Sequence, residues 1–129
     1  MTEVHKRICV FGASSSSIPE SCIDFAYSLG ELLAKNDMGL VFGAGRSGLM
    51  GACARGAHSG NGEIIGIIPE KLNIPGIYYE YCTERIETPT MHERKALMEE
   101  KADAFVALPG GFGTIEELME VMTLKQLGY

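Results

Sequence analysis

The segment LPGGFGTIEE, residues 108–117, places three glycines and two glutamates around the expected start of a helix. Glycine has no side chain, so the backbone N–H groups of this segment can face a ligand directly. A helix beginning at Thr114 adds unpaired amides and the positive end of its dipole, and both favour a bound phosphate. The alternative is an ordinary capping box, in which Thr114 and Glu117 satisfy each other's backbone amides. Under either interpretation the amide cluster attracts anions.

The two glutamates, Glu116 and Glu117, are adjacent, so on a helix they point about 100° apart and cannot do the same job. The helix dipole favours the ionised form of a carboxylate in the first turn. An ionised carboxylate beside a sugar can stabilise positive charge at the anomeric carbon, or orient a water against it. The segment lacks the G-K-[ST] of a triphosphate-binding loop, so nucleotide-triphosphate hydrolysis is not expected.

A second segment, MHERK at residues 91–95, opens another expected helix. One face of that helix combines two cations with two methionines: Met91, Arg94, Lys95 and Met98. This combination suits the wall of a cleft that meets an anion and a flat apolar group together. The alternative is a pair of solvated charges on a helix surface. His92 and Glu93 point elsewhere, and we expect His92 to be a surface histidine.

The segment GAGRSG, residues 43–48, matches the G-x-G-x-x-G pattern of dinucleotide-binding turns. That fingerprint also needs an acidic residue about 20 positions on, at the carboxyl end of the next strand. Glu63 has the spacing but precedes its strand, so NAD binding is disfavoured. A tight turn with close helix–sheet packing and a different nucleotide or phosphate ligand are the two other interpretations. Arg46 is either a surface charge or a ligand contact.

These segments lie between regular elements that alternate along the chain. Apolar runs predict strands at residues 7–11, 39–42, 63–68 and 104–108, all buried, and a weaker strand at 81–88. Apolar periodicity predicts helices at residues 19–36, 48–59, 91–101 and 115–127. Capping boxes are expected at three helix starts, Ser17, Thr90 and Thr114. The alternation predicts an α/β fold, a Rossmann-like doubly wound parallel sheet covered on both faces.

Every glycine- or serine-rich loop follows an expected strand: GASSSS at residues 12–17, GAGRSG, and PGGFGT at residues 109–114. All three loops therefore open on the same edge of the sheet. In such sheets ligands bind beyond the carboxyl ends of the strands. The role of the serines at 14–17 stays open at this stage.

Composition limits the class of protein. The chain has 129 residues, 46% of them hydrophobic and 22% charged, which fits one globular domain over residues 1–129. A net charge of −6 argues against a nucleic-acid partner, and no apolar run approaches the ~20 residues that span a bilayer. The four cysteines are dispersed among apolar or small residues, so we expect buried free thiols and a cytoplasmic protein.

Taken together, GAGRSGLMG, MHERK and PGGFGTIEE resemble the LOG family. Its members are cytokinin riboside 5′-monophosphate phosphoribohydrolases, long mislabelled as lysine decarboxylases. The pattern M-x-x-R-K followed by P-G-G-x-G-T-x-x-E carries the resemblance, which runs from ICVFGASS to LKQLGY. It implies hydrolysis of the N-glycosidic bond of AMP or N6-modified AMP by a homodimer, with no metal and no other cofactor.

The resemblance also implies roles for individual residues. The family's catalytic arginine and glutamate fall on Arg94 and Glu117. Its substrate-binding positions fall on Lys95, Gly111, Phe112, Gly113, Thr114, Ile115, Glu116 and Thr123. Ala44 stands where relatives usually have glycine, and the usual family chain continues beyond Tyr129 with more strand and helix, so the C-terminal part of the fold is expected to be missing. Three methionines are expected to be exposed and compatible with a dimer interface: Met91, Met98 and Met119.

Two other functions compete with this one. A non-catalytic nucleotide-binding module with a Rossmann-like fold would need a phosphate site but not both Glu117 and Arg94. An amino-acid decarboxylase finds no support, because Lys95 lies beside an arginine on a helix face and nothing suggests a pyridoxal site. The sequence does not choose between AMP and N6-substituted AMP.

Overall fold

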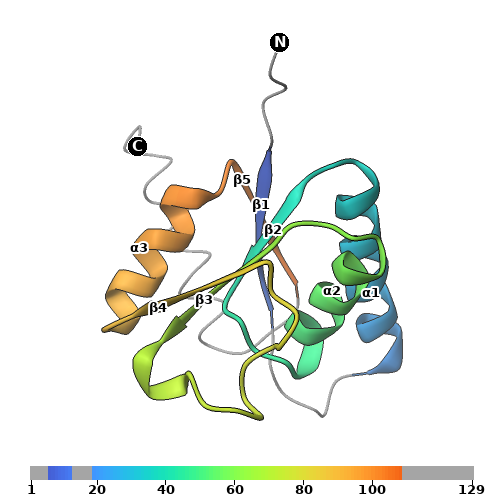
Figure 1. Cartoon of the computed structure of the whole chain (residues 1–129). Helices are drawn as coiled ribbons and strands as arrows, with labels where there is room; N and C mark the ends of the chain where they lie inside the picture. Colours follow the sequence, from blue (N-terminus) through green and yellow to red (C-terminus); the bar gives the residue numbers. More distant parts are fainter. Residues whose placement is uncertain (1–5, 13–18, 109–129) are drawn as a thin grey trace.

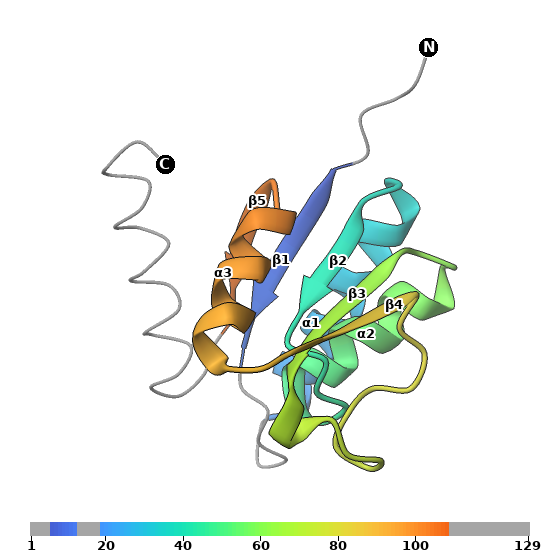
Figure 2. The same ribbon diagram turned by 60° about the vertical axis from the view of Figure 1, so that its left-hand side comes forward.

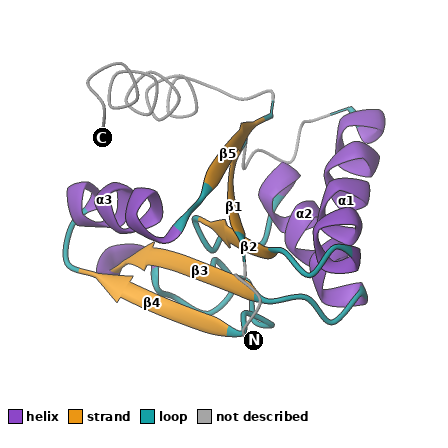
Figure 3. Cartoon of the chain, turned by 90° about the horizontal axis from the view of Figure 1, so that it is seen from above, coloured by secondary structure: helices purple, strands orange, loops and turns teal. Residues whose placement is uncertain are grey.

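The fold is a three-layer arrangement around one parallel sheet, seen in a computed structural model that describes residues 6–12 and 19–108. Five strands pair in the order β4-β3-β2-β1-β5, and all four pairings are parallel (Figures 1 and 3). The strands are β1 (Arg7–Phe11), β2 (Gly39–Phe42), β3 (Ile64–Pro69), β4 (Glu84–Thr88) and β5 (Ala104–Ala107). The expected α/β class with a parallel sheet is confirmed.

Helices cover both faces of this sheet, as a doubly wound fold requires. The helices are α1 (Glu20–Lys35), α2 (Gly48–Ser59) and α3 (Met91–Lys101), with a short 3₁₀ turn η1 (Glu70–Leu72) after β3. Figure 2 shows α3 on the near side of the sheet, with α1 and α2 behind it. None of the described helices is long and apolar enough to cross a membrane.

The two apolar layers follow from the alternation of side chains along each strand. Leu40 and Phe42 face α1 and α2 in one buried cluster, whereas Val41 between them faces α3 in the other. Helices α1 and α2 approach each other closely through small residues. A Cβ on Gly30 would lie 1.9 Å from the Cys53 carbonyl oxygen, so this contact admits only glycine.

The path of the chain creates a topological switch point. It runs outward from β1 through β2 and β3 to β4, and α3 then carries it back across the sheet to β5, on the other side of β1. The carboxyl ends of β1 and β5 are joined where the Leu108 N–H donates to the Phe11 carbonyl at 2.7 Å. In open α/β sheets this is the position where ligands bind.

Several expected details are wrong. Helix α1 begins at Glu20 with Pro19 as its N-cap, whereas the expected capping box put the N-cap at residue 17; proline offers no side-chain acceptor for the first turn. Strand β4 begins at Glu84 rather than at residue 81, because the preceding residues form a connection that packs on the loop after β2. Strand β5 is only partly buried, because among the described residues it pairs with β1 alone at the edge of the sheet. The expected helix at 115–127 lies outside the described residues.

Helices α1 and α2 end in the same hydrogen-bonded motif. After α1, the N–H of Asp37 donates to the Ala34 carbonyl and the N–H of Met38 to the Leu33 carbonyl, which is the Schellman pattern. The residue at the turn has a positive φ in both motifs, 57° at Asp37 and 56° at Asn61. Asp37 and Asn61 therefore adopt a left-handed backbone conformation that glycine adopts at lower energetic cost.

We expect Asp37→Gly to raise the free energy of unfolding by roughly 1 kcal/mol, because Asp37 is exposed and its left-handed backbone favours glycine. Urea unfolding followed by circular dichroism measures the change. Asp37→Ala is the matched control, because it also removes the carboxylate but keeps the Cβ, and it should bring no such gain. Equal stabilisation by both variants would contradict this explanation.

All four cysteines are free thiols, as expected, but their burial differs. Cys9 and Cys53 are buried, whereas Cys22 and Cys82 are only partly covered. Burial raises the pKa of the Cys53 thiol to about 12, and burial likewise raises the pKa of Cys82 to about 11. The folded protein therefore keeps these two protons at a pH where an unfolded thiol, with a pKa of 9.0, has lost them.

This difference predicts a loss of stability in alkali. Above pH 9 the unfolded chain binds fewer protons than the folded one, so the free energy of unfolding falls as pH rises towards the folded pKa values. The slope is at most about 1.4 kcal/mol per pH unit for each thiol. Urea unfolding of the wild type and of Cys53→Ala between pH 8 and 11 isolates one thiol. Parallel pH profiles for the two proteins would contradict the assignment.

Candidate active site

The start of α3 lies at the carboxyl edge of the sheet because it directly follows β4. A tight turn sets its direction: the buried Thr88 hydroxyl donates to the Thr90 carbonyl at 3.1 Å. The same carbonyl accepts the backbone N–H of Arg94 at 3.1 Å. The Thr90 hydroxyl accepts the Glu93 N–H at 3.2 Å, which confirms the N-cap expected at this threonine. The first turn of α3 is thus fixed by local hydrogen bonds at the edge where ligands are expected.

Arg94 reaches from this turn to the first residue after β2 and to a carbonyl within β3. Its Nε donates to the Ile67 carbonyl at 3.0 Å, and its Nη2 donates to the Gly43 carbonyl at 2.7 Å. Strand β2 ends opposite Gly66, so the carbonyl of Ile67 lies just beyond the β2–β3 ladder. The half-buried guanidinium thus donates hydrogen bonds to carbonyls that the β2–β3 ladder does not use. For Arg94, the interpretation as a solvated surface charge is wrong.

The rest of this helix face divides between core and surface. Met98 is 2% exposed and packs with Phe11, Val41 and Ile67, so the expectation that it is exposed is wrong. It lies one turn beyond Arg94 and reaches the sheet where the helix crosses it. Met91 is 50% exposed, with its sulfur 3.7 Å from Nη1 of Arg94, and Lys95 is partly covered.

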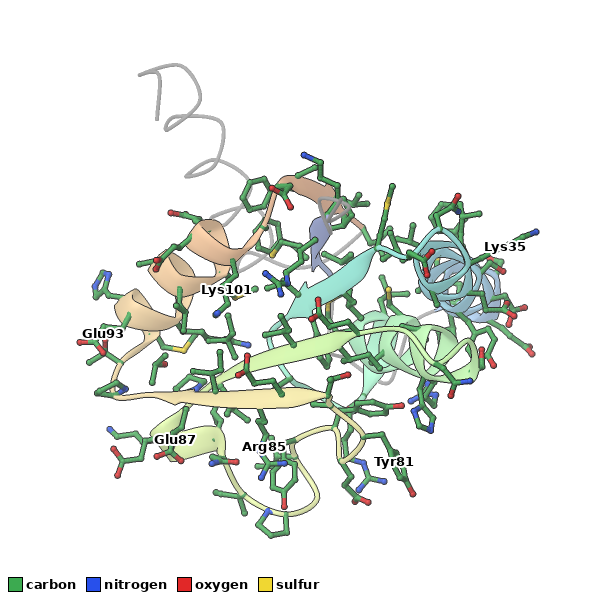
Figure 4. The ribbon with its side chains drawn as sticks, turned by 45° about the horizontal axis from the view of Figure 1, so that its top comes forward. Lys35, Tyr81, Arg85, Glu87, Glu93 and Lys101 are labelled. Carbon is green, nitrogen blue, oxygen red and sulfur yellow. The ribbon has the colours of Figure 1, made fainter. Side chains whose placement is uncertain are left out.

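The opposite side of α3 faces solvent, as expected. His92 and Glu93 are both exposed, and Figure 4 shows Glu93 at the outer side of the helix, away from the sheet. Helix α3 therefore presents Arg94 inward at the carboxyl edge and keeps its acidic side chain in the first turn away from that position.

The GAGRSG loop is held against the connection between β3 and β4. The Tyr79 N–H donates to the Ala44 carbonyl at 2.7 Å, and the Arg46 N–H donates to the Ile77 carbonyl at 3.1 Å. The Arg46 side chain is half exposed, with a nitrogen 3.8 Å from the Glu80 carboxylate. This contact is a loose surface ion pair, which leaves the Arg46 guanidinium accessible at the loop.

The acidic residue of a dinucleotide fingerprint is not at this edge. The Glu63 carboxylate accepts from Arg7 Nε at 2.9 Å, and Arg7 begins β1 at the opposite, amino edge of the sheet. Hydrogen bonding to this carboxylate raises the pKa of the Arg7 guanidinium. The structure therefore agrees with the sequence in disfavouring NAD at the GAGRSG loop.

Of the site residues expected from the sequence, the structure describes Arg94 and Lys95, adjacent on α3. The others lie outside the described residues: Gly111, Phe112, Gly113, Thr114, Ile115, Glu116, Glu117 and Thr123. Sequence reasoning missed the carbonyls of Gly43 and Ile67, which bind the arginine. For Gly43, the sequence offers one signal, a glycine directly after a buried strand. For Ile67, it offers none, because a backbone carbonyl inside a strand can belong to any residue type. Within residues 6–12 and 19–108, no group of three or more His, Cys, Asp and Glu could hold a metal ion.

This geometry can be compared with known proteins. The family model described as "Possible lysine decarboxylase" matches residues 50–129. The chain is 47% identical over 123 residues to the cytokinin riboside 5′-monophosphate phosphoribohydrolase LOG2 of Arabidopsis thaliana. It is 46% identical over 123 residues to the probable enzyme LOGL9 of Oryza sativa subsp. japonica. Both alignments cover 95% of this chain, but it spans only 58% and 54% of the length of these relatives.

Solved structures share the fold at lower identity. A molybdenum cofactor binding protein from Rippkaea orientalis matches with a TM-score of 0.84 at 23% identity, over 96% of this chain and 74% of the other. The molybdenum cofactor carrier protein of Chlamydomonas reinhardtii matches with a TM-score of 0.82 at 24% identity, over 95% and 73%. These likenesses concern the Rossmann-like fold. The family match over more than half of the chain agrees with the MHERK and PGGFGTIEE motifs, and the chain belongs to the LOG family.

Proposed function

We propose that this protein hydrolyses the N-glycosidic bond of AMP or of an N6-substituted AMP. Water adds to C1′ of the ribose, the C1′–N9 bond breaks, the base leaves with a proton, and ribose 5-phosphate remains. The observation that carries the proposal is the fixed position of Arg94 at the carboxyl edge of the sheet. The 47% identity to a riboside 5′-monophosphate phosphoribohydrolase supports the same chemistry.

Arg94 would act as a fixed positive charge. A guanidinium keeps its proton at neutral pH, so Arg94 is unsuited to protonate the leaving base. It would instead hold the phosphoribosyl group or the departing base by charge and hydrogen bonds. Two backbone carbonyls already restrain its side chain, so little reorganisation is needed when the substrate binds.

Glu117 would supply the complementary negative charge. It would stabilise the oxocarbenium-like ribosyl cation and position the attacking water. The amides of residues 111–114 would hold the 5′-phosphate with Lys95 nearby, and we assign the remaining substrate contacts to Ile115, Glu116 and Thr123. Leu108 is hydrogen-bonded to Phe11 at the switch point, so the chain leaves β5 towards residues 109–114 at the edge that carries Arg94.

The alternative is a nucleotide-binding module without chemistry, acting as a carrier or sensor. Structures of cofactor carriers share the fold, but at 23% and 24% identity their likeness does not extend to function. Hydrolysis is favoured because a phosphate carrier needs no fixed arginine paired with a separate carboxylate. We also propose a homodimer, with the exposed Met91 at or near its interface.

Incubation with AMP and with N6-isopentenyl-AMP separates these functions. We expect release of free adenine or free N6-isopentenyladenine, together with ribose 5-phosphate, followed by liquid chromatography. The ratio of the two rates gives the preferred base, which the sequence leaves open. Tight binding of either nucleotide without base release would reject hydrolysis in favour of the binding module.

Arg94→Ala and Glu117→Gln test the two charges. Each variant should lower kcat/KM for base release by at least about 100-fold, because each removes a charge that is needed most in the transition state. The far-ultraviolet circular dichroism should be unchanged. His92→Ala is the matched control for Arg94→Ala, because it removes an exposed side chain from the same helix and should keep full activity. Full activity in purified Arg94→Ala or Glu117→Gln would refute the assignment.

A further inference from the structure

Gly43, the first glycine of GAGRSG, lies directly beneath the guanidinium of Arg94. A Cβ added to Gly43 would stand 1.8 Å from Nη2, 2.9 Å from Cζ and 3.5 Å from Nε of Arg94. Chain neighbours aside, these are the three atoms nearest to that Cβ position. The space that a side chain would need at residue 43 is therefore filled by one group, the arginine head.

The backbone does not explain this glycine. The described glycines with positive φ are Gly48, at 64°, and Gly76, at 94°, so residue 43 has a conformation that alanine can adopt. At Gly45, two positions along, an added Cβ would meet nothing within 4 Å. Within GAGRSG, Gly48 is explained by its positive φ and Gly43 by its contact with Arg94, whereas neither explanation applies to Gly45.

We propose that Gly43 is a positioning residue for Arg94, a role that rests on the proposed function. Its missing side chain admits the guanidinium, and its carbonyl binds Nη2 at 2.7 Å while the Ile67 carbonyl binds Nε at 3.0 Å. Two acceptors, one in the loop after β2 and one in β3, fix both the position and the plane of the guanidinium. The first glycine of the G-x-G-x-x-G pattern in this chain then serves to position an arginine rather than to bind a dinucleotide. The position of Glu63 at the opposite edge of the sheet agrees with this role.

Gly43→Ala should displace Arg94 and leave the fold in place, because the collision is with the end of a flexible side chain rather than with backbone. Nη2 has to retreat by more than about 1 Å, and misplacement of that size can cost about 100-fold in rate. We therefore expect kcat/KM for base release to fall by about 100-fold. The Nε–H resonance of Arg94 in ¹⁵N NMR spectra, identified by its loss in Arg94→Lys, should shift and lose protection from solvent exchange.

A double-mutant cycle tests the contact without using activity. Gly43→Ala should lower the urea midpoint when Arg94 is present, because the bonds to both carbonyls are lost. In the Arg94→Ala background the same change should not lower the midpoint, because the space is then empty. Gly45→Ala is the control and should leave the Arg94 Nε–H resonance in place.

The results separate the two proposals. If the wild type releases no base, the proposed function fails, and the cycle together with the Nε–H resonance still decides whether Gly43 seats Arg94. An equal fall in midpoint in both backgrounds, or an unchanged Arg94 resonance in Gly43→Ala, overturns the positioning role even if the enzyme is active.

Discussion

The site depends on one interaction, the binding of the Arg94 guanidinium by two backbone carbonyls, that of Gly43 directly after β2 and that of Ile67 within β3. A parallel sheet leaves such carbonyls wherever one strand stops before its neighbour, and β2 stops opposite Gly66. Binding them with a charged donor satisfies the backbone and fixes the donor in one step. The same hydrogen bonds thus complete the edge of the sheet and place the cation.

The elements around this interaction are arranged so that the arginine has little freedom. Thr88 and Thr90 set the start of α3, and Met98 holds the next turn of the helix in the apolar layer. Arg94 lies between the capped turn and the buried methionine, so its Cα is restrained from both sides. The fold contributes position, and the side chain contributes charge.

Much of this arrangement follows from sequence. The bounds of α2 and α3 and of the first two strands were predictable, because the apolar pattern and the flanking loop residues indicated the same boundaries. The N-cap at Ser17 was not, because Pro19 follows closely and takes that position itself. The burial of Met98 was missed because a helical wheel shows which residues share a face but not which of them reach the sheet. Likewise the wheel put Arg94 on the correct face, while its two acceptors lie 27 and 51 residues away in sequence and needed the tertiary fold.

The order of the two motifs is itself a geometric consequence of the fold. MHERK opens the crossover helix of a βαβ unit, and the PGGFGT segment follows the strand to which that helix leads. Helix α3 has 11 residues and at 1.5 Å each descends about 16 Å, from the carboxyl edge to the amino edge. The 4 residues of β5 and Leu108 climb back by roughly the same distance at about 3.3 Å each. The two lengths match, so the chain returns to the edge where Arg94 is bound. One such unit therefore brings Arg94 and Leu108, the residue that precedes the glycine-rich segment, to the same edge, and changing the length of either element alone would separate them.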